Sequence, residues 1–215
     1  MARNKYPELT EEKILEAAQR LFLEKGYENT TIQDIVDELG GLTKGAVYHH
    51  FKSKEEIMDA VGDRMFLENN PFEAVRGRTD LSGLEKLREA IRLNQADPAR
   101  TSMTAQAIPL VRNPRVLVGM IESNRQLLTP YFQALLEEGN RDGSLHTDYP
   151  RELAELLPLL TSLWMLPSVF PSDREGLRRK FSFLGDMLEK MGVPLFDGTI
   201  LPLVDELLDR VPTQD

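Results

Sequence analysis

The chain contains no cysteine, and this absence removes three kinds of chemistry from consideration. Without thiols there can be no disulfide framework, and neither a cysteine nucleophile nor a thiolate metal ligand is available. Long apolar runs are missing as well, since no stretch approaches the roughly 20 residues that span a bilayer. No N-terminal segment resembles a signal peptide. We therefore expect a cytoplasmic protein with no membrane partner.

The alternating apolar and polar pattern of half-buried strands is also absent, whereas helical spacing recurs throughout the 215 residues. Gly26 and Gly40 follow the first two helical stripes, as expected of residues that end helices in a left-handed conformation. The sequence predicts an all-α fold. The expected helices cover residues 10–25, 31–39, 43–49, 53–68, 80–94, 98–110, 114–140, 150–164, 177–191 and 200–209, with bends at Pro130 and Pro158.

One basic segment stands out in a chain whose net charge is −9. Residues 42–54 contain three lysines, two histidines, a tyrosine and a threonine, and no acid. The region after residue 55 carries most of the negative charge, since residues 56–215 hold 18 basic against 25 acidic side chains. A basic segment in an acidic chain indicates a polyanionic partner, and the phosphates of DNA are the obvious candidate.

A helix, a glycine turn and a short polar helix together form a helix-turn-helix, whose second helix lies in the major groove. Residues 10–60 resemble the DNA-binding domain of the tetracycline-repressor (TetR/AcrR) family of bacterial transcription regulators. The matching residues are Ile14, Ala17, Ala18, Phe22, Gly26, Tyr27, Thr30, Thr31, Ile35, Thr43, Lys44, Gly45, Tyr48, His50, Phe51, Lys54 and Glu55.

The resemblance implies an architecture and a mode of action. A three-helix DNA-binding domain over residues 1–55 would precede a helical effector-binding and dimerisation domain over residues 56–215. A homodimer would place two recognition helices on a palindromic operator in double-stranded DNA. The resemblance also implies a repressor that leaves its operator when a small molecule binds the second domain. The predicted pocket lining described below favours a small, largely hydrophobic molecule. Neither its identity nor the operator sequence follows from the residues.

Each residue of the motif suggests a specific contact with DNA. Thr43 and Lys44 start the recognition helix, where free N–H groups and the helix dipole favour phosphate. Lys54 starts the following helix, where its charge opposes the dipole unless phosphate meets it. We predict base-edge contacts from Leu42, Thr43, Ala46 and His49. The remaining predicted DNA-binding residues are Thr31, Gly45, Tyr48 and His50.

The turn departs from the family pattern by one residue, because it has two glycines before Leu42-Thr43 where the family usually has one. The extra Gly41 either lengthens the turn or extends the preceding helix. Each alternative would change how the recognition helix is presented to DNA.

Two amides interrupt apolar stripes in the second domain, Gln106 and Asn124. A buried amide without partners costs about 1–3 kcal/mol, so protein, water or a ligand must satisfy each one. A structural core amide is the simpler explanation for either residue alone. The sharper hypothesis is an effector pocket with both amides and an apolar wall of Met103, Met120 and Trp164.

Two C-terminal stripes suggest a protein partner. The spacing in the second stripe alternates between four and three residues, which is typical of a coiled-coil seam, although packing within one chain gives the same pattern. The family resemblance implies that these two helices pair with their copies in a dimer. The predicted interface residues are Leu153, Leu156, Leu160, Leu177, Phe181, Leu184 and Leu188.

Two other functional classes remain open. A DNA-binding regulator without an effector would share the same N-terminal motif. A helical enzyme would need catalytic groups, but His146 near Asp142 and Asp148 beside a Gly-Ser loop is more typical of a solvated surface. Adjacent His49 and His50 point about a quarter-turn apart, which disfavours a shared metal. We expect no enzyme activity, no cofactor and no metal.

Overall fold

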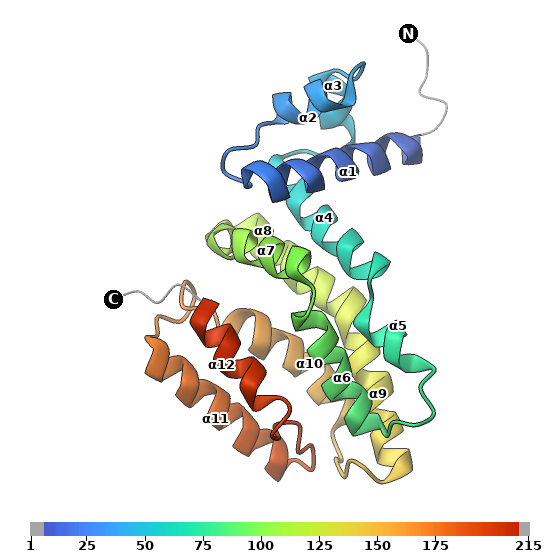
Figure 1. The fold of residues 1–215 in the computed structure, drawn as a ribbon, viewed down its shortest axis with the longest axis vertical. Helices are drawn as coiled ribbons and strands as arrows, with labels where there is room; N and C mark the ends of the chain where they lie inside the picture. The colour runs from blue at the N-terminus through green and yellow to red at the C-terminus, as the bar shows by residue number, and fades with distance from the viewer. Residues whose placement is uncertain (1–6, 211–215) are drawn as a thin grey trace.

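The computed structural model describes residues 7–210, with side chains described for residues 9–206, and every regular element within that range is helical. Three helices form a unit at one end of the molecule (Figure 1). These are α1 (Pro7–Lys25), α2 (Ile32–Leu39) and α3 (Lys44–His50), and α4 (Lys54–Glu68) runs from them toward the rest of the chain. None of the described helices is long and apolar enough to cross a membrane.

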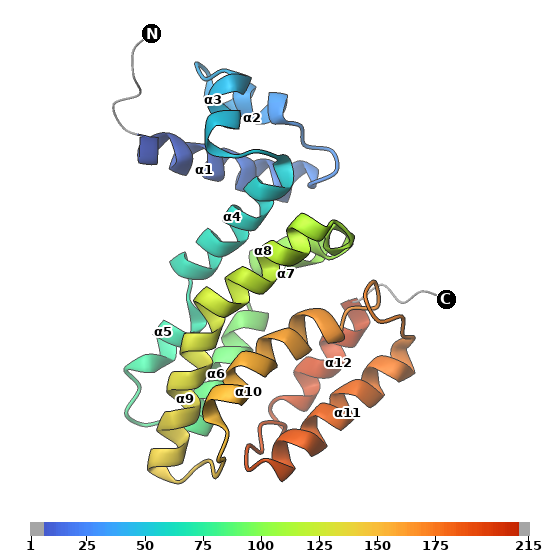
Figure 2. The same ribbon diagram turned by 180° about the vertical axis from the view of Figure 1, so that it is seen from behind.

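The remaining helices form a larger body below this unit. Figure 2 shows α8 continuing into α9 along the body, with α10, α11 and α12 on one side of it. The elements are α5 (Pro71–Arg76), α6 (Gly83–Gln95), α7 (Pro98–Ala107), the 3-10 turn η1 (Ile108–Arg112), α8 (Pro114–Ser123), the π segment η2 (Asn124–Leu128), α9 (Thr129–Asp142), α10 (Pro150–Leu159), the π segment η3 (Leu160–Trp164), α11 (Arg174–Lys190) and α12 (Leu201–Arg210).

Local sequence signals explain most helix boundaries. Thr31 and Asp34 form a capping box at the start of α2. Ser53 caps α4 by accepting from the Glu56 N–H, but the Glu56 carboxylate accepts from the Lys52 N–H, so the reciprocal capping box is incomplete. Before α12, the Asp197 carboxylate accepts from the N–H groups of Thr199 and Ile200.

The structure departs from the expected helices in three places. The first helix begins at Pro7, before the start expected at residue 10. The short α5 was not expected; Asn70 caps it, and Pro71 occupies its first position, where no N–H is needed. The bends expected at Pro130 and Pro158 appear as π segments beside each proline, which accommodate its missing N–H.

Two main cores hold the chain together. The first joins α1, α2 and α3 to α4, as far as Met65, and reaches Met103 of α7. It therefore extends beyond residue 55, and the division of the chain there stays a prediction. The second core fills the body between α5, α6, α9, α10 and α11. Within it, α6 and α9 cross so closely that a Cβ on Gly83 would lie 2.3 Å from the Gly139 nitrogen. Glycine is therefore required at this crossing.

Candidate DNA-binding surface and ligand cavities

The recognition helix α3 presents its polar residues to solvent. Thr43 caps it, and its Oγ1 accepts from the Ala46 N–H at 3.2 Å. Val47 and Phe51 are buried and hold α3 against the core, as the sequence predicted. The side chains of Thr43, Lys44, Tyr48 and His49 are exposed, as is Gly45, whereas Leu42 and Ala46 are partly covered. This end of the molecule therefore offers hydrogen-bond donors and one lysine to a partner.

The additional glycine lengthens the turn. Helix α2 ends at Leu39, Gly40 takes a left-handed conformation with φ 50°, and Gly41 has φ 135°. Side chains rarely adopt either φ, so both positions favour glycine. Helix α3 then begins at Lys44. Of the two alternatives for Gly41, extension of α2 is wrong.

Two predicted phosphate contacts are turned inward. The Lys54 Nζ donates to the carbonyls of Tyr27 and Thr30, both at 2.8 Å, and lies 4.0 Å from the centre of the Tyr27 ring. Its charge is thus satisfied inside the protein, so the helix dipole does not require a phosphate at Lys54, and the predicted DNA contact stays a prediction. The His50 side chain is 8% exposed, with Nδ1 3.8 Å from a Glu11 carboxylate oxygen. Both residues attach α3 and α4 to α1 and its loop.

Thr31 is exposed, but its hydroxyl is already engaged with Asp34. Its Oγ1 donates to Asp34 Oδ2 at 2.5 Å and accepts from the Asp34 N–H. The hydrogen bonds that the Thr31 hydroxyl and backbone N–H donate to the Asp34 carboxylate, together with Lys25, hold its pKa well below its usual range. A phosphate contact from Thr31 would have to share this hydroxyl.

Gln106 connects the body to the DNA-binding unit. Its Oε1 accepts from the Tyr27 N–H at 2.6 Å, across 79 residues of sequence. This is the protein partner that a partly covered amide requires. Together with Lys54, it fixes the α1–α2 connection from two sides, one on α4 and one on α7.

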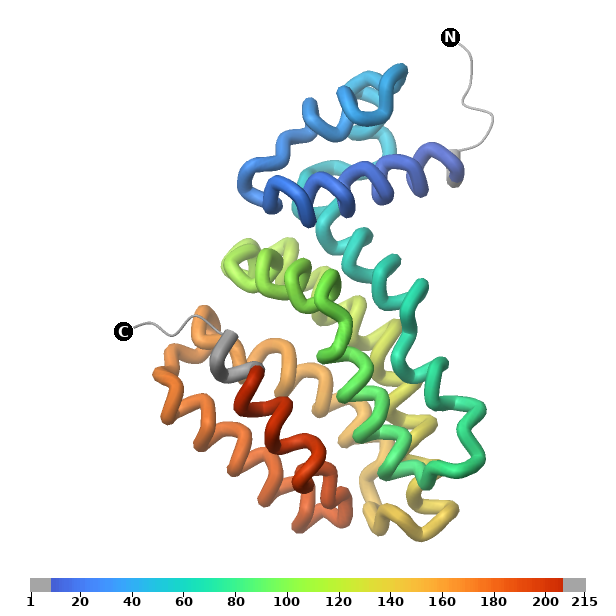
Figure 3. Tube along the Cα trace, in the orientation of Figure 1, coloured from blue at the N-terminus to red at the C-terminus, as the bar shows by residue number. Residues whose placement is uncertain are grey.

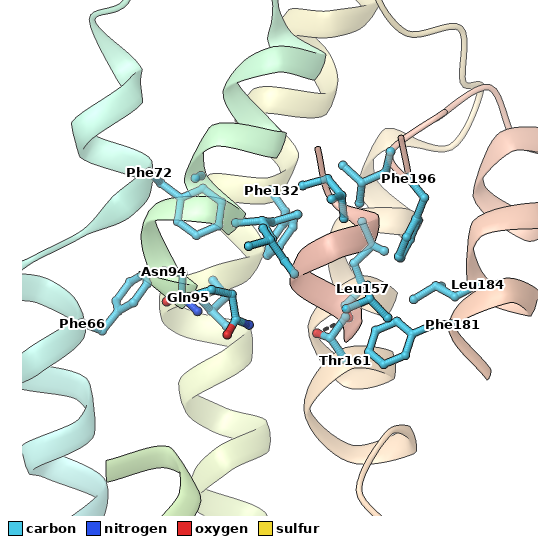
Figure 4. Close-up of a pocket in the computed structure, with 17 residues that line it drawn as sticks. Phe66, Phe72, Asn94, Gln95, Phe132, Leu157, Thr161, Phe181, Leu184 and Phe196 are labelled. Atoms are coloured by element: carbon cyan, nitrogen blue, oxygen red, sulfur yellow. Dashed lines mark hydrogen bonds between the residues drawn. The ribbon is translucent and has the colours of Figure 1, made fainter. Parts of the chain in front are cut away.

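The first cavity lies inside the body and has a volume of about 280 Å³. Figure 4 shows Phe66, Phe72 and Phe132 on one side and Phe181 and Phe196 on the other. Polar atoms come from Asn94, Gln95 and Thr161, but the Thr161 hydroxyl donates to the Leu157 carbonyl at 2.9 Å. A mostly apolar cavity with a few amides suits a small hydrophobic molecule. Sequence periodicity could not identify it, because its lining comes from helices distant along the chain.

The second cavity, of about 550 Å³, lies where α4 faces α7, α8 and η2. Met103, Met120 and Asn124 line it, which brings together three of the five predicted effector residues. Gln106 and Trp164 line neither cavity. Trp164 instead packs on Phe183, with ring centres 5.8 Å apart. The single pocket predicted from all five residues is therefore wrong in its composition.

The predicted dimer seam is largely internal. Leu153, Leu177, Leu184 and Leu188 are each at most 1% exposed within this chain, and Leu160 and Phe181 are partly covered by the body core. They form the intramolecular packing that gives the same spacing. Leu156, 40% exposed, is the one predicted interface residue with a large free apolar surface, and Phe183 on α11 is 58% exposed.

Comparison with known proteins agrees with this geometry. The family model for "Bacterial regulatory proteins, tetR family" matches residues 14–61. The HTH-type transcriptional repressor KstR2 of Rhodococcus jostii is 34% identical over 149 residues, covering 66% of this chain and 70% of the relative. The HTH-type transcriptional regulator UidR of Escherichia coli is 22% identical over 188 residues, covering 85% and 91%. A crystal structure of a TetR-family regulator from Pectobacterium atrosepticum aligns with TM-score 0.62 at 24% identity, covering 89% of this chain and 98% of that one.

The chain is a DNA-binding transcriptional regulator with an all-α fold. It belongs to the TetR family. Members of this family regulate transcription and are not enzymes, so the expectation of no enzyme activity is confirmed by these relatives.

Proposed function

We propose that this regulator is a repressor that binds a palindromic operator as a homodimer and leaves it when a small hydrophobic molecule occupies the body. The observation that carries the proposal is α4, which begins in the DNA-binding unit and whose Phe66 lines both cavities. The name of the Rhodococcus relative supports repression. Because its target is chromosomal DNA, the protein would act in the cytoplasm.

The DNA-binding unit of the proposal is residues 1–55, with the effector and dimerisation body in residues 56–215. Lys44 would contact phosphate, and Thr43 and His49 would approach phosphate or base edges with Leu42 and Ala46. Tyr48 is exposed and free to reach the backbone of the duplex. Gly45 would allow close approach of the helix to DNA.

Ligand entry would act through the two contacts that fix the α1–α2 connection. A molecule between α4 and the body displaces Phe66, and α4 carries this displacement to Lys54 and hence to the Tyr27 and Thr30 carbonyls. Gln106 resists it from α7. The two recognition helices would then leave their register with successive major grooves, which lie roughly 34–36 Å apart. Ligand and operator must therefore weaken each other's binding reciprocally.

The dimer would use the exposed face of α10 and α11, with Leu156 and Phe183, in place of the buried leucines. Phe183→Glu places a charge at this face and should convert the dimer to a monomer in sedimentation at micromolar concentration. Glu137→Gln, on α9, is a control away from that face. A Phe183→Glu protein that remains dimeric would contradict this interface.

The proposal is tested by selecting purified protein against random duplex DNA at two salt concentrations. We expect a two-fold symmetric motif whose half-sites lie about one helical turn apart. Fluorescence anisotropy of the labelled operator then follows its release by naphthalene, a small neutral aromatic probe. Binding without a symmetric motif would contradict the operator model. An operator complex unaffected by the probe at saturation would contradict the hydrophobic effector.

A further inference from the structure

The second cavity has an apolar wall made largely of methionine. Its volume of about 550 Å³ falls within the range of small-molecule sites. Flexible, polarisable methionine side chains adapt to ligands of irregular shape. The methionines that line it are Met58 and Met65 of α4, Met103 of α7 and Met120 of α8.

Two carboxylates enter this apolar cavity from α4. Asp59 and Asp63 lie one helical turn apart, and both are partly buried. Asp63 accepts a hydrogen bond from the Ser123 hydroxyl, whereas no hydrogen bond or ion pair to another described residue reaches Asp59. Across the cavity, a Cβ on Gly119 would lie 2.8 Å from the Asp59 Oδ2. The Asp59 carboxylate therefore faces α8 without a partner.

The other charged groups around the cavity leave this negative charge uncompensated. Glu56 on α4 and Glu122 on α8 add further carboxylates, and Glu122 is paired with Arg125. Arg100 on α7 is the one cation among the described lining residues. Its Nη1 donates to the Asn94 side chain, and its Nη2 donates to the carbonyls of Met65 and Asn69. These bonds direct the guanidinium toward the end of α4, while its buried Nε has no hydrogen-bond partner among the described residues.

A buried amide adds a second, independent demand for a donor. Asn124 is 8% exposed and lines the cavity. Its Nδ2 donates to the Ser162 hydroxyl at 2.9 Å, but no donor from the described residues reaches its Oδ1. Although the residue is largely buried, this oxygen is not fully enclosed, and a ligand in the cavity that donates a hydrogen bond or carries positive charge would be favoured at it.

We infer that this cavity binds an amphipathic organic cation, with Asp59 and Asp63 recognising its ammonium group and the methionines covering its apolar body. The inference rests on the proposed ligand-responsive function and names the ligand class of that cavity. An inorganic ion fits less well, because no group of three metal-ligating His, Cys, Asp or Glu side chains occurs in the described part of the chain.

Cation binding should be linked to protons. Burial, together with the negative charges of Asp63, Glu56 and Glu55, raises the pKa of Asp59 to about 7. Burial also raises the pKa of Asp63, an effect that the Ser123 hydrogen bond opposes. A bound ammonium favours the ionised carboxylates and lowers both pKa values. Binding near neutral pH therefore releases protons, and affinity for the cation falls as pH decreases below about 7.

The test compares benzyltrimethylammonium with neopentylbenzene, its uncharged isostere, by equilibrium dialysis against the full-length protein. We expect the cation to bind more tightly at pH 8, and its affinity to fall by up to about tenfold per pH unit below 7. Calorimetry in two buffers of different ionisation enthalpy should show proton release. Equal binding of both compounds, or affinity independent of pH, would overturn the inference.

Substitutions in the cavity test where the cation binds. Asp59→Asn and Asp63→Asn should each lower the affinity for the cation by about tenfold and leave the affinity for neopentylbenzene unchanged. Asp148→Asn, an exposed carboxylate beyond α9, is the matched charge control and should change neither. Gly119→Ala should also weaken the cation by pushing the Asp59 carboxylate aside. Unchanged cation affinity in both aspartate variants would show that the cation binds elsewhere.

Operator anisotropy separates this inference from the proposed function. The cation should release the operator from the wild-type protein but not from Asp59→Asn, although both bind operator equally without ligand. If naphthalene releases the operator and the cation does not, the ligand class is wrong while the repressor proposal stands. If neither compound releases the operator, both the inferred ligand class and the proposed ligand-responsive repressor are contradicted.

Discussion

The DNA-binding unit and the body are both built from helices, but their interiors are packed differently. In the unit, Ile14, Phe22 and Val47 are completely buried, and neither cavity is lined by any residue of α1, α2 or α3. In the body, two cavities adjoin at Phe66 and Leu128, and two π segments interrupt its long helices. The comparison suggests that rigidity is needed where a surface must fit DNA, and free space where a ligand must enter.

The largest expected effect tests the difference in packing. Phe22→Ala should destabilise the protein by about 3–5 kcal/mol, because the ring is fully buried and packs on Tyr27. Phe132→Ala should cost less, since this ring already borders a cavity. Urea unfolding measures both. Equal losses of stability would mean that the two cores do not differ in the way described.

A second pair of variants separates a lysine that meets DNA from one that meets the protein. Lys44→Ala should weaken operator binding and reduce the slope of log affinity against log salt by about 1. Lys54→Met should instead lower the free energy of unfolding by about 1–3 kcal/mol, because two carbonyls lose their donor. Arg141→Ala, exposed on α9, controls for net charge. A reduced salt slope in a stable Lys54→Met protein would restore the phosphate contact predicted from the sequence.

The connection between the two regions should be weakened by Gln106→Ala. The Tyr27 N–H loses its acceptor, which should cost about 1–2 kcal/mol in unfolding and reduce the operator release produced by ligand. Gln133→Ala removes an amide that bonds only to Glu137 on its own helix and serves as the control. Full ligand response in the Gln106→Ala protein would show that this hydrogen bond does not couple the regions.

The smallest expected effect is a pH-dependent difference in melting temperature. A carboxyl whose folded pKa of about 7 lies above its unfolded value binds more protons when folded, so stability falls as pH rises between those values. Asp59→Asn removes this pH-dependent loss of stability. Because Asp59 is only partly buried, solvent screening reduces the full linkage to about 1 kcal/mol, so the melting temperature of the variant relative to wild type should increase by roughly 2–4 °C between pH 5 and pH 8. A constant difference across that range would indicate that Asp59 titrates normally.

Sequence patterns predicted the DNA-binding unit well because its determinants are local. The Thr31 and Thr43 caps and the glycine ends of the helices lie within a few residues of what they control. The inward turn of Lys54 was not predictable, since its acceptors at Tyr27 and Thr30 are set by tertiary packing. For the same reason the sequence could not show that the Gln106 Oε1 accepts from the Tyr27 N–H and that this residue lines neither cavity.

The body was predicted less well for a related reason. An apolar stripe such as Leu177, Leu184 and Leu188 predicts that one helix face is buried. It does not tell whether that face packs against the same chain or against a second copy. The cavity lining combines α4 with helices many residues later, which no spacing rule connects. Glycine offered a clearer signal: Gly40 and Gly41 are where the backbone takes conformations that side chains rarely adopt.

The length of α4 turns small local movements into larger distant ones. Its course from the body to the unit is continuous in Figure 3. Its 15 residues rise about 22 Å, so a tilt of about 5° about the C-terminal end moves the N-terminal end by about 2 Å. Lys54 sits at that moving end with both of its carbonyl contacts at 2.8 Å. A ligand that shifted Phe66 by a fraction of an ångström, as proposed above, would therefore act through a lever long enough to break both contacts.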